Sequence, residues 1–502
     1  MKKFRFLSVT LIVFLGLSFL IKGQSKDPFV YQHKFTQDMG GPFESSNSNS
    51  RYALTVAMVD QGSFFLDPRL AAFSSPDVSK NRSQKYISIF TPGISLLSAP
   101  FYSLGKQLGF PQLFAYSLNI ILAILNFYLI YLIIRKLSFN SPLALVSAGV
   151  FIFGTNAYSY AGTLTQHHAV TSALLGLVLL TLSSLNLRNN FLFGLLFGIG
   201  LLMDIPFTVY ALPLVIYNLW RHIKINNRLP FLKFNPVLLV MLFGLSAPLY
   251  FFARYNFQTT GSYSTLAQSI GRNFDFIGSP KDSEPDSINS APKVKKPGGI
   301  FRVYKSRYLI QGLYTLVISN ERSIFLYSPS LAIAALGFII YLQSKSKFML
   351  QAIFASAVIG LISYAMFADP WGGWSYGPRY LIPSAALLCL FIPYAIQKFA
   401  KSKIFTSIFV ILLTSSVFIN VLGGLTTNLV PPKQEAIHLI EPIPYNFTYN
   451  WQLIKSGNTH SLPYILWFSK FITPLQFYLI IASSISLFFS IIYFKSRHEI
   501  IS

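Results

Sequence analysis

The chain has 502 residues, of which 53% are hydrophobic and only 11% are charged. A soluble protein carries about 25% charged residues, so this composition excludes a water-soluble globular chain and indicates an integral membrane protein. The excess of 40 Lys and Arg over 16 Asp and Glu gives a net charge of +24. Membrane topology explains this excess, and no nucleic-acid partner is implied. The single cysteine, Cys389, excludes an intramolecular disulfide and a cysteine-based metal site.

Apolar blocks of about 17–25 residues predict an all-α polytopic membrane protein with about twelve transmembrane segments. Blocks of this length fit helices and not the alternating strands of an outer-membrane barrel. The first block, 6–21, reads either as a signal peptide or as an anchor helix, and we favour the anchor because no clear cleavage site follows it. The further predicted spans are 113–134, 142–160, 169–187, 236–252, 324–343, 349–366, 380–397, 404–423 and 474–494.

The stretch 191–219 has two interpretations. A single helix would place the following basic residues outside, whereas two short halves that turn at Asp204-Ile205-Pro206 return them to the cytoplasm. The second interpretation obeys the positive-inside rule. It predicts a protein of the cytoplasmic (inner) membrane with both termini in the cytoplasm and nearly all of its acidic residues outside.

The predicted organisation has five parts. They are an N-terminal anchor helix (1–22), a first outer loop (23–112), a transmembrane helical domain (113–423) that contains a second outer loop (253–323), a third outer loop (424–473), and a last transmembrane helix with a cytoplasmic tail (474–502). Because the other loops are short, we expect function to reside in the three long ones and the active face to point outward. Within 253–323, the segment 272–308 reads as a mobile loop that either closes over substrate or only connects.

The first outer loop contains signals for two short helices. Arg51 to Gln61 is predicted as a helix, with Asn49 or Ser50 as its N-cap and Gly62 at its end. Its many apolar residues favour a position at the membrane interface. A second element covers 94–108, after the run 86–93.

Several ordered blocks of residues between about 50 and 385 form a recognisable set of motifs. In the first outer loop they are Ser50 to Thr55, Val59 to Ser63, Tyr86 to Gly93 and Ser95 to Tyr102. Further on they are Arg254-Tyr255-Asn256 with Gly261-Ser262, then Glu321 to Pro329, and, as the most specific match, Trp371 to Pro383. Together these blocks resemble those of bacterial GT-C membrane glycosyltransferases, a class that includes protein O-mannosyltransferases and the aminoarabinose transferase that decorates lipid A. The resemblance implies transfer of a sugar from a polyprenyl-phosphate carrier to a lipid, glycan or protein acceptor.

Such a transfer needs a base for the acceptor hydroxyl and cations for the departing phosphate. The resemblance implies that the base is an acid close before the first short helix, but this chain has Ser and Asn there. We therefore rank the nearest acids as Glu44 first, Asp38 second and Asp77 third, each against the alternative of a solvated loop acid. Asp60 and Asp67 read as structural.

Arg379 is the best-placed phosphate ligand, because it stands at the outer end of a predicted span after a Gly- and Trp-rich turn. The alternative is an interfacial arginine beside belt aromatics. The other candidate substrate-binding residues are Arg51, Tyr86, His167, His168, Arg254, Arg322, Trp374 and Tyr380.

The adjacent His167 and His168 point about 100° apart on a helix, so they do not easily share one ion. A divalent metal is a possible cofactor, with a polar interfacial pair as the alternative. Asp204 is either a functional acid or the structural cap of a hairpin turn.

Other function classes remain open at this point. A transporter or flippase would place polar residues near the middle of the membrane and show repeated halves, and the sequence shows neither apart from Asp204. A polysaccharide polymerase or ligase, or an inactive relative that only binds the carrier lipid, would share this architecture.

Overall fold

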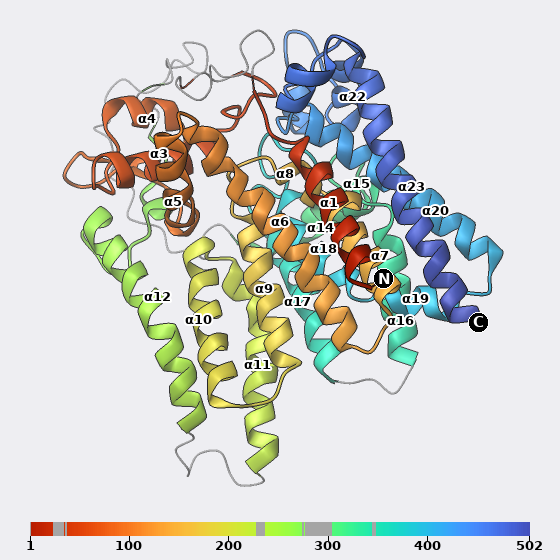
Figure 1. Cartoon of the computed structure of the whole chain (residues 1–502). Helices are drawn as coiled ribbons and strands as arrows, with labels where there is room; N and C mark the ends of the chain where they lie inside the picture. The colour runs from red at the N-terminus through yellow and green to blue at the C-terminus, as the bar shows by residue number, and fades with distance from the viewer. Residues whose placement is uncertain are drawn as a thin grey trace.

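Long apolar helices make up most of the computed structural model, which describes residues 2–23, 35, 38–226, 236–273, 276, 304–343 and 348–502. The longer helices run roughly alongside one another (Figure 1). They are α1 (Lys2–Ser18), α6 (Pro111–Lys136), α7 (Ser141–Gly154), α9 (His167–Thr181), α10 (Leu187–Met203), α11 (Phe207–Asn226), α12 (Pro236–Thr260), α16 (Leu331–Gln343), α17 (Phe348–Ala365), α18 (Ile382–Cys389), α19 (Ile392–Lys398), α20 (Lys403–Leu425) and α23 (Pro474–Ile501). The predicted all-α polytopic fold is confirmed.

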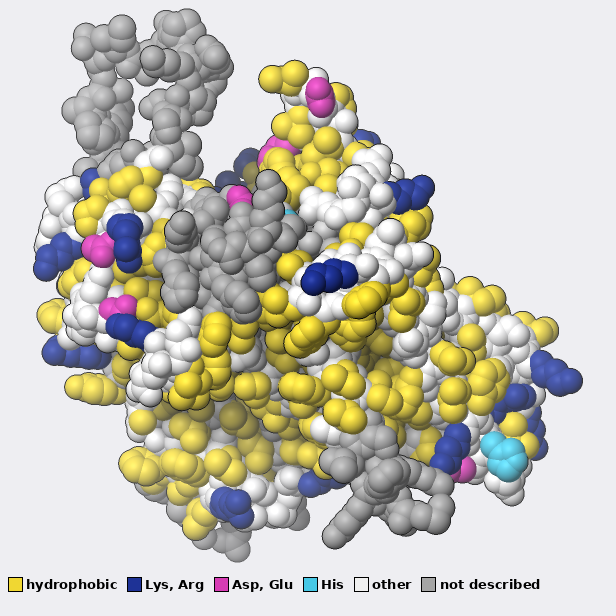
Figure 2. Space-filling model, turned by 45° about the horizontal axis from the view of Figure 1, so that its top comes forward, with side chains coloured by type: hydrophobic (Ala, Val, Ile, Leu, Met, Phe, Trp, Pro, Cys, Tyr) yellow, Lys and Arg dark blue, Asp and Glu magenta, His cyan; other side chains and the backbone are white. Residues whose placement is uncertain are grey.

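By length and composition, five of the described helices are apolar enough to cross a membrane, and the bent pair α18–α19 would be a sixth. α1, α7, α9, α10 and α16 contain shorter apolar helices. All of these helices overlap predicted spans, but the number of about twelve spans stays a prediction. Figure 2 shows hydrophobic side chains over much of the bundle's surface, which is the surface that lipid requires.

Breaks interrupt three of the predicted spans. α7 ends at Gly154 before the short α8 (Ala157–Tyr160), and α15 (Ile324–Tyr327) is separated from α16 by Ser328-Pro329-Ser330. α18 and α19 meet at 44°. A proline removes a backbone donor and clashes with the preceding turn, which accounts for the break at Pro329.

The hairpin interpretation of 191–219 agrees with the structure. α10 ends at Met203 and α11 begins at Phe207, so the chain turns at 204–206 as predicted. Both helices are longer than the predicted halves. α10 packs tightly on α12. The backbones approach so closely at Gly194 that an added Cβ would lie only 1.8 Å from the Met241 carbonyl oxygen. Small residues allow such close contact between membrane helices.

The shorter elements of the predicted first and third outer loops gather at one end of the bundle, the top of Figure 1. The first loop contains α3 (Ser46–Asp60), α4 (Pro68–Ser74), α5 (Gly93–Gln107), and strands β1 (Val78–Lys80) and β2 (Tyr86–Ser88), which pair antiparallel with Val78 opposite Ser88. The remaining elements are α13 (Ala267–Ile270), a 3-10 turn (Ser306–Tyr308), α14 (Leu309–Leu313), a π-turn (Tyr314–Ile318), a 3-10 turn (Arg379–Leu381), α21 (Lys433–Ala436), α22 (Phe447–Lys455) and a π-turn (Tyr464–Phe468).

The predicted start of the first short helix is wrong. α3 begins at Ser46, and Asn49 and Ser50 do not cap it: the Asn49 amide donates to the Phe43 carbonyl, and the Ser50 hydroxyl donates to the Asp77 carbonyl at 2.7 Å. The helix is buried from Ser48 to Ala57 among other residues of the protein, and its position at the membrane interface stays a prediction. Its predicted end is right, since Gly62 has a φ of +59°.

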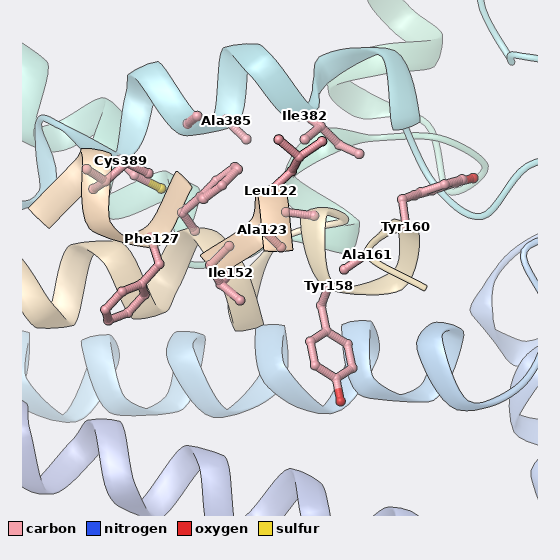
Figure 3. Close-up of a cluster of buried hydrophobic side chains, with 14 of the residues drawn as sticks. Leu122, Ala123, Phe127, Ile152, Tyr158, Tyr160, Ala161, Ile382, Ala385 and Cys389 are labelled. Atoms are coloured by element: carbon pink, nitrogen blue, oxygen red, sulfur yellow. The ribbon is translucent and has the colours of Figure 1, made fainter. Parts of the chain in front are cut away.

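The core beneath this end is formed where α6, α7, α8 and α18 meet. Figure 3 shows Leu122 and Phe127 of α6, Ile152 of α7, and Ile382 and Cys389 of α18 packed together. Tyr158 and Tyr160 leave α8 in different directions (Figure 3), and Tyr160 accepts a hydrogen bond from the Tyr376 N–H at 3.0 Å. This contact ties α8 to the turn that carries Arg379.

Candidate functional site

Arg379 follows a turn whose Gly372, Gly373 and Gly377 all have positive φ values. Glycine adopts this backbone conformation without steric cost, so the turn can reverse tightly before α18. The half-buried Arg379 side chain donates from Nη2 to the Gly372 carbonyl at 2.7 Å, and its guanidinium carbon lies 5.4 Å from the centre of the Tyr380 ring. Its Nε is buried and has no hydrogen-bond partner. Arg379 therefore has donor capacity left for a ligand.

A small pocket opens beside Arg379. Two other predicted residues, Glu44 and Trp374, line it. Sequence reasoning missed its other lining residues, which are Pro42, Ser45, Ser48, Tyr160, Thr163, Thr165, Asn428 and Leu429. These carry no charge and form no motif, so only the tertiary contacts reveal them.

Arg51 lies on α3 and is buried, with 1% of its surface exposed. Its Nη1 donates to the backbone and side-chain oxygens of Asn47, and its guanidinium stacks on Phe90 at 3.8 Å. Burial lowers the pKa of Arg51 to about 10, so the side chain stays charged at neutral pH. Arg379 is close enough to contribute to this lowering. Arg51 and Arg379 are therefore two cations that interact electrostatically at this end of the bundle.

The two histidines separate as predicted. His167 lies 5.6 Å from the Tyr160 ring and 6.3 Å from the Tyr380 ring, so it faces the Arg379 side of the site. His168 points into the bundle, where Nε2 contacts the Ala157 carbonyl at 2.9 Å and Nδ1 contacts the Asn126 amide. No group of three or more His, Cys, Asp and Glu that would hold a metal occurs among the described residues, so the geometry gives the metal interpretation no support.

Glu44, ranked first as base, is tied into the structure by four donors. Lys22 Nζ lies 3.1 Å from Oε1, the Asn428 N–H donates to Oε1 at 3.0 Å, the Gly40 N–H donates to Oε2 at 2.7 Å, and the Thr427 hydroxyl also donates to Oε2. A carboxylate whose oxygens already accept four hydrogen bonds has little capacity left for an acceptor proton. The arrangement favours a structural junction between the end of α1, the first loop and the segment after α20.

The other predicted acids also have roles in the loops. Asp77 accepts from the Ser46 hydroxyl at 2.8 Å and pairs with Arg272 Nη2 at 2.9 Å. Asp38 is half-buried in the segment before Gly40. Asp60 pairs with Lys106, and Asp67 caps α4 by accepting from the Leu70 N–H, which supports the structural interpretation of both.

Three further candidates lie outside the pocket lining. Arg322 is fully buried and donates to the carbonyls of Glu321, Trp371, Val430 and Tyr445, so it braces the surrounding loops. Arg254 is exposed on α12. Tyr86 belongs to β2, where Lys80 lies over its ring at 4.9 Å. Most of the predicted loop 272–308, including 277–303, lies outside the described residues.

Comparisons with known proteins agree with the fold and the site geometry described above. Residues 92–251 match the family described as dolichyl-phosphate-mannose-protein mannosyltransferase. No curated protein sequence matches the chain. The apo structure of ArnT from Cupriavidus metallidurans aligns with a TM-score of 0.52 and 12% identity, covering 100% of this chain and 78% of that one. A structure of the same protein bound to undecaprenyl phosphate aligns with a TM-score of 0.48 and 11% identity, covering 100% and 77%.

The family match and the apo ArnT structure agree with the resemblance found in the sequence. The chain shares the fold of the apo ArnT structure, and its long apolar helices are those of a multi-pass membrane protein, as predicted.

Proposed function

We propose that this protein is a membrane glycosyltransferase that moves a sugar from a polyprenyl-phosphate carrier to a lipid, glycan or protein acceptor at the outer face of the cytoplasmic membrane. The observation that carries the proposal is the pair of neighbouring cations Arg51 and Arg379, each with a buried Nε that has no partner. Arg379 lines a small pocket, and both cations belong to elements at one end of an apolar helical bundle. The GT-C fold and the family match over 92–251 support the same function.

The geometry suits phosphate chemistry. When the bond between the anomeric carbon and the phosphate oxygen breaks, negative charge develops on the carrier phosphate. Guanidinium groups pair with phosphate oxygens through charge-assisted hydrogen bonds, and Arg379 has an unused donor next to the pocket. In this proposal Trp374, which lines the pocket, and the half-buried Tyr380 contact the sugar, and the bundle's apolar surface contacts the carrier's lipid tail.

A transporter or flippase is the second candidate, and the described geometry favours it less. A transport site near the middle of the membrane would place polar groups along the helices. The charged residues of this site lie elsewhere: Arg51 is in the first loop, Asp204 is in the turn between α10 and α11, and Arg379 begins a 3-10 turn.

The proposal is tested by mass spectrometry of the lipids that copurify with the detergent-extracted protein. We expect a polyprenyl phosphate, or its glycosylated form, with the native protein and strongly reduced amounts with Arg379→Ala. Arg82→Ala, which changes an exposed arginine in the turn after β1, is the matched control and should retain the lipid. Ordinary phospholipid alone in every sample would contradict the proposed function and favour the transporter.

A further inference from the structure

Asp204 brings a carboxylate to this site from an element other than the predicted base loop. It follows the last residue of α10 in the turn to α11, and its Oδ2 accepts a hydrogen bond from Gln166 Nε2 at 3.2 Å. The first outer loop fixes this turn in place. Thr91 donates to the Met203 carbonyl at 2.8 Å, and a Cβ on Gly93 would lie 2.5 Å from the Leu202 carbonyl oxygen.

Arg51 is the cation that interacts most strongly with Asp204. Each is the largest charged influence on the other's pKa, yet no ion pair joins them in the part of the chain that the structure describes. Arg51 Nε and Gln166 Oε1 are both buried without a partner, on side chains that are only 1% and 6% exposed. Buried polar atoms normally have hydrogen-bond partners, so these two point to a ligand between α3, the start of α9 and the Asp204 turn.

The surroundings of Asp204 differ from those of the loop acids. Glu44 contacts the ammonium of Lys22, and Asp77 contacts the guanidinium of Arg272. Asp204 instead accepts hydrogen bonds from neutral donors, the Gln166 side-chain amide and the Ile205 backbone N–H. Its carboxylate therefore keeps acceptor capacity while it lies near the cations of the site.

Two tyrosines of an aromatic cluster, Tyr364 and Tyr380, interact electrostatically with Asp204. Tyr364 and Tyr380 stack with ring centres 4.5 Å apart, and Phe367 lies 5.9 Å from Tyr380. The charged and titratable groups that interact with Asp204 are Arg51, Tyr210, Tyr304, Tyr364 and Tyr380. Burial in this environment raises the pKa of Asp204 above that of a free aspartate.

We propose that Asp204 is the general base of the transfer, an inference that rests on the proposed function. The acceptor hydroxyl gives its proton to an Asp204 carboxylate oxygen while its own oxygen forms a bond to the anomeric carbon of the sugar. The bond between that carbon and the phosphate oxygen breaks, and its electron pair leaves on the polyprenyl phosphate beside Arg51 and Arg379. Asp204 then releases the proton to water.

The test combines a binding measurement with a turnover measurement on the full-length protein. The binding probe is undecaprenyl phosphate in detergent micelles, and turnover is the conversion of the copurified glycosylated carrier to free carrier on addition of membrane extract as the acceptor source. Asp204→Asn should reduce turnover by about 10²-fold or more, which is the usual contribution of a positioned base. It should also bind undecaprenyl phosphate more tightly, by about fivefold, because it removes a negative charge near the anion.

A purely structural role predicts a different pattern. If Asp204 only caps the turn, Asp204→Asn should weaken binding and lower the thermal stability together, which would overturn the inference. Turnover at the native rate would overturn it as well. Asp204→Glu keeps the charge and should restore part of the turnover. Asp60→Asn, which changes an outer-loop acid paired with Lys106, is the matched control and should leave both readouts at native values.

The outcome also separates this inference from the proposed function. If the native protein itself does not bind undecaprenyl phosphate, the proposed function fails, and this inference with it. If the native protein binds and turns over the carrier but Asp204→Asn does so equally well, only the assignment of the base fails.

Discussion

The buried ion pair between Lys22 and Glu44 offers a direct test of whether Glu44 is a base or a structural junction. Its side chains are 3% and 1% exposed, whereas those of the Lys106–Asp60 pair are 57% and 26% exposed. Glu44→Gln leaves the Lys22 ammonium buried without its counter-charge and replaces one acceptor oxygen by a donor. Breaking a buried pair by removing one partner costs about 3–5 kcal/mol.

The measurement is equilibrium unfolding of the detergent-solubilised protein. We expect Glu44→Gln to lower the free energy of unfolding by about 3–5 kcal/mol. The double variant Lys22→Met/Glu44→Gln should recover at least about 1 kcal/mol relative to the sum of the single changes, because neither charge is left alone. Asp60→Asn, which breaks the exposed pair, should cost less than about 1 kcal/mol.

One result would refute this reasoning. Suppose that the free energy of unfolding of Glu44→Gln lies within about 1 kcal/mol of the native value but the variant no longer transfers sugar. The four donors around Glu44 would then not define its role. Glu44 would then return to first place as the base.

Three further predictions follow from the site and the packing. Arg322→Ala should lower the free energy of unfolding by more than about 3 kcal/mol, because several carbonyls lose their donor. Arg379→Ala should leave the free energy of unfolding near the native value but lose undecaprenyl phosphate binding. Calorimetry measures the first effect, and a binding titration measures the second. Turnover should fall as the pH is lowered, and the fall should begin above the usual pKa range of an aspartate. Burial raises the pKa of Asp204, and only its ionised form accepts a proton. The pH–rate profile of the native protein checks this prediction, and a profile that is flat on the acidic side contradicts it. Gly194→Ala should destabilise the α10–α12 contact, since its Cβ would lie 1.8 Å from the Met241 carbonyl oxygen, and a native unfolding midpoint would show that α12 moves freely.

Much of the architecture follows from local sequence patterns. Apolar length predicted the helices, and the positive-inside rule chose the turn at 204–206 over one long helix. The Gly- and Trp-rich run before Arg379 predicted a tight turn with a cation at its end, and the structure has this arrangement. The motif around Arg51 also predicted it as a substrate-binding residue, but the sequence did not predict that its side chain is buried.

The roles of the acids could not be predicted in the same way. Glu44 receives two of its donors from Thr427 and Asn428, which lie more than 380 positions away in the chain. α3 begins earlier than predicted for a similar reason, since the Asn49 and Ser50 side chains bond to other loop groups and not to the helix end. Such partners depend on which loops meet in space.

The sequence by itself therefore determined the membrane class, the positions of the helices and the Arg379 turn. These properties depend on hydrophobic length, charge bias and local backbone preferences, all of which act over short stretches of chain. Only the tertiary structure showed that Glu44 has four donors around it, that Arg322 donates to four loop carbonyls, and that Asp204 interacts with Arg51. Those distinctions depend on the long-range contacts that satisfy or leave open each buried polar group.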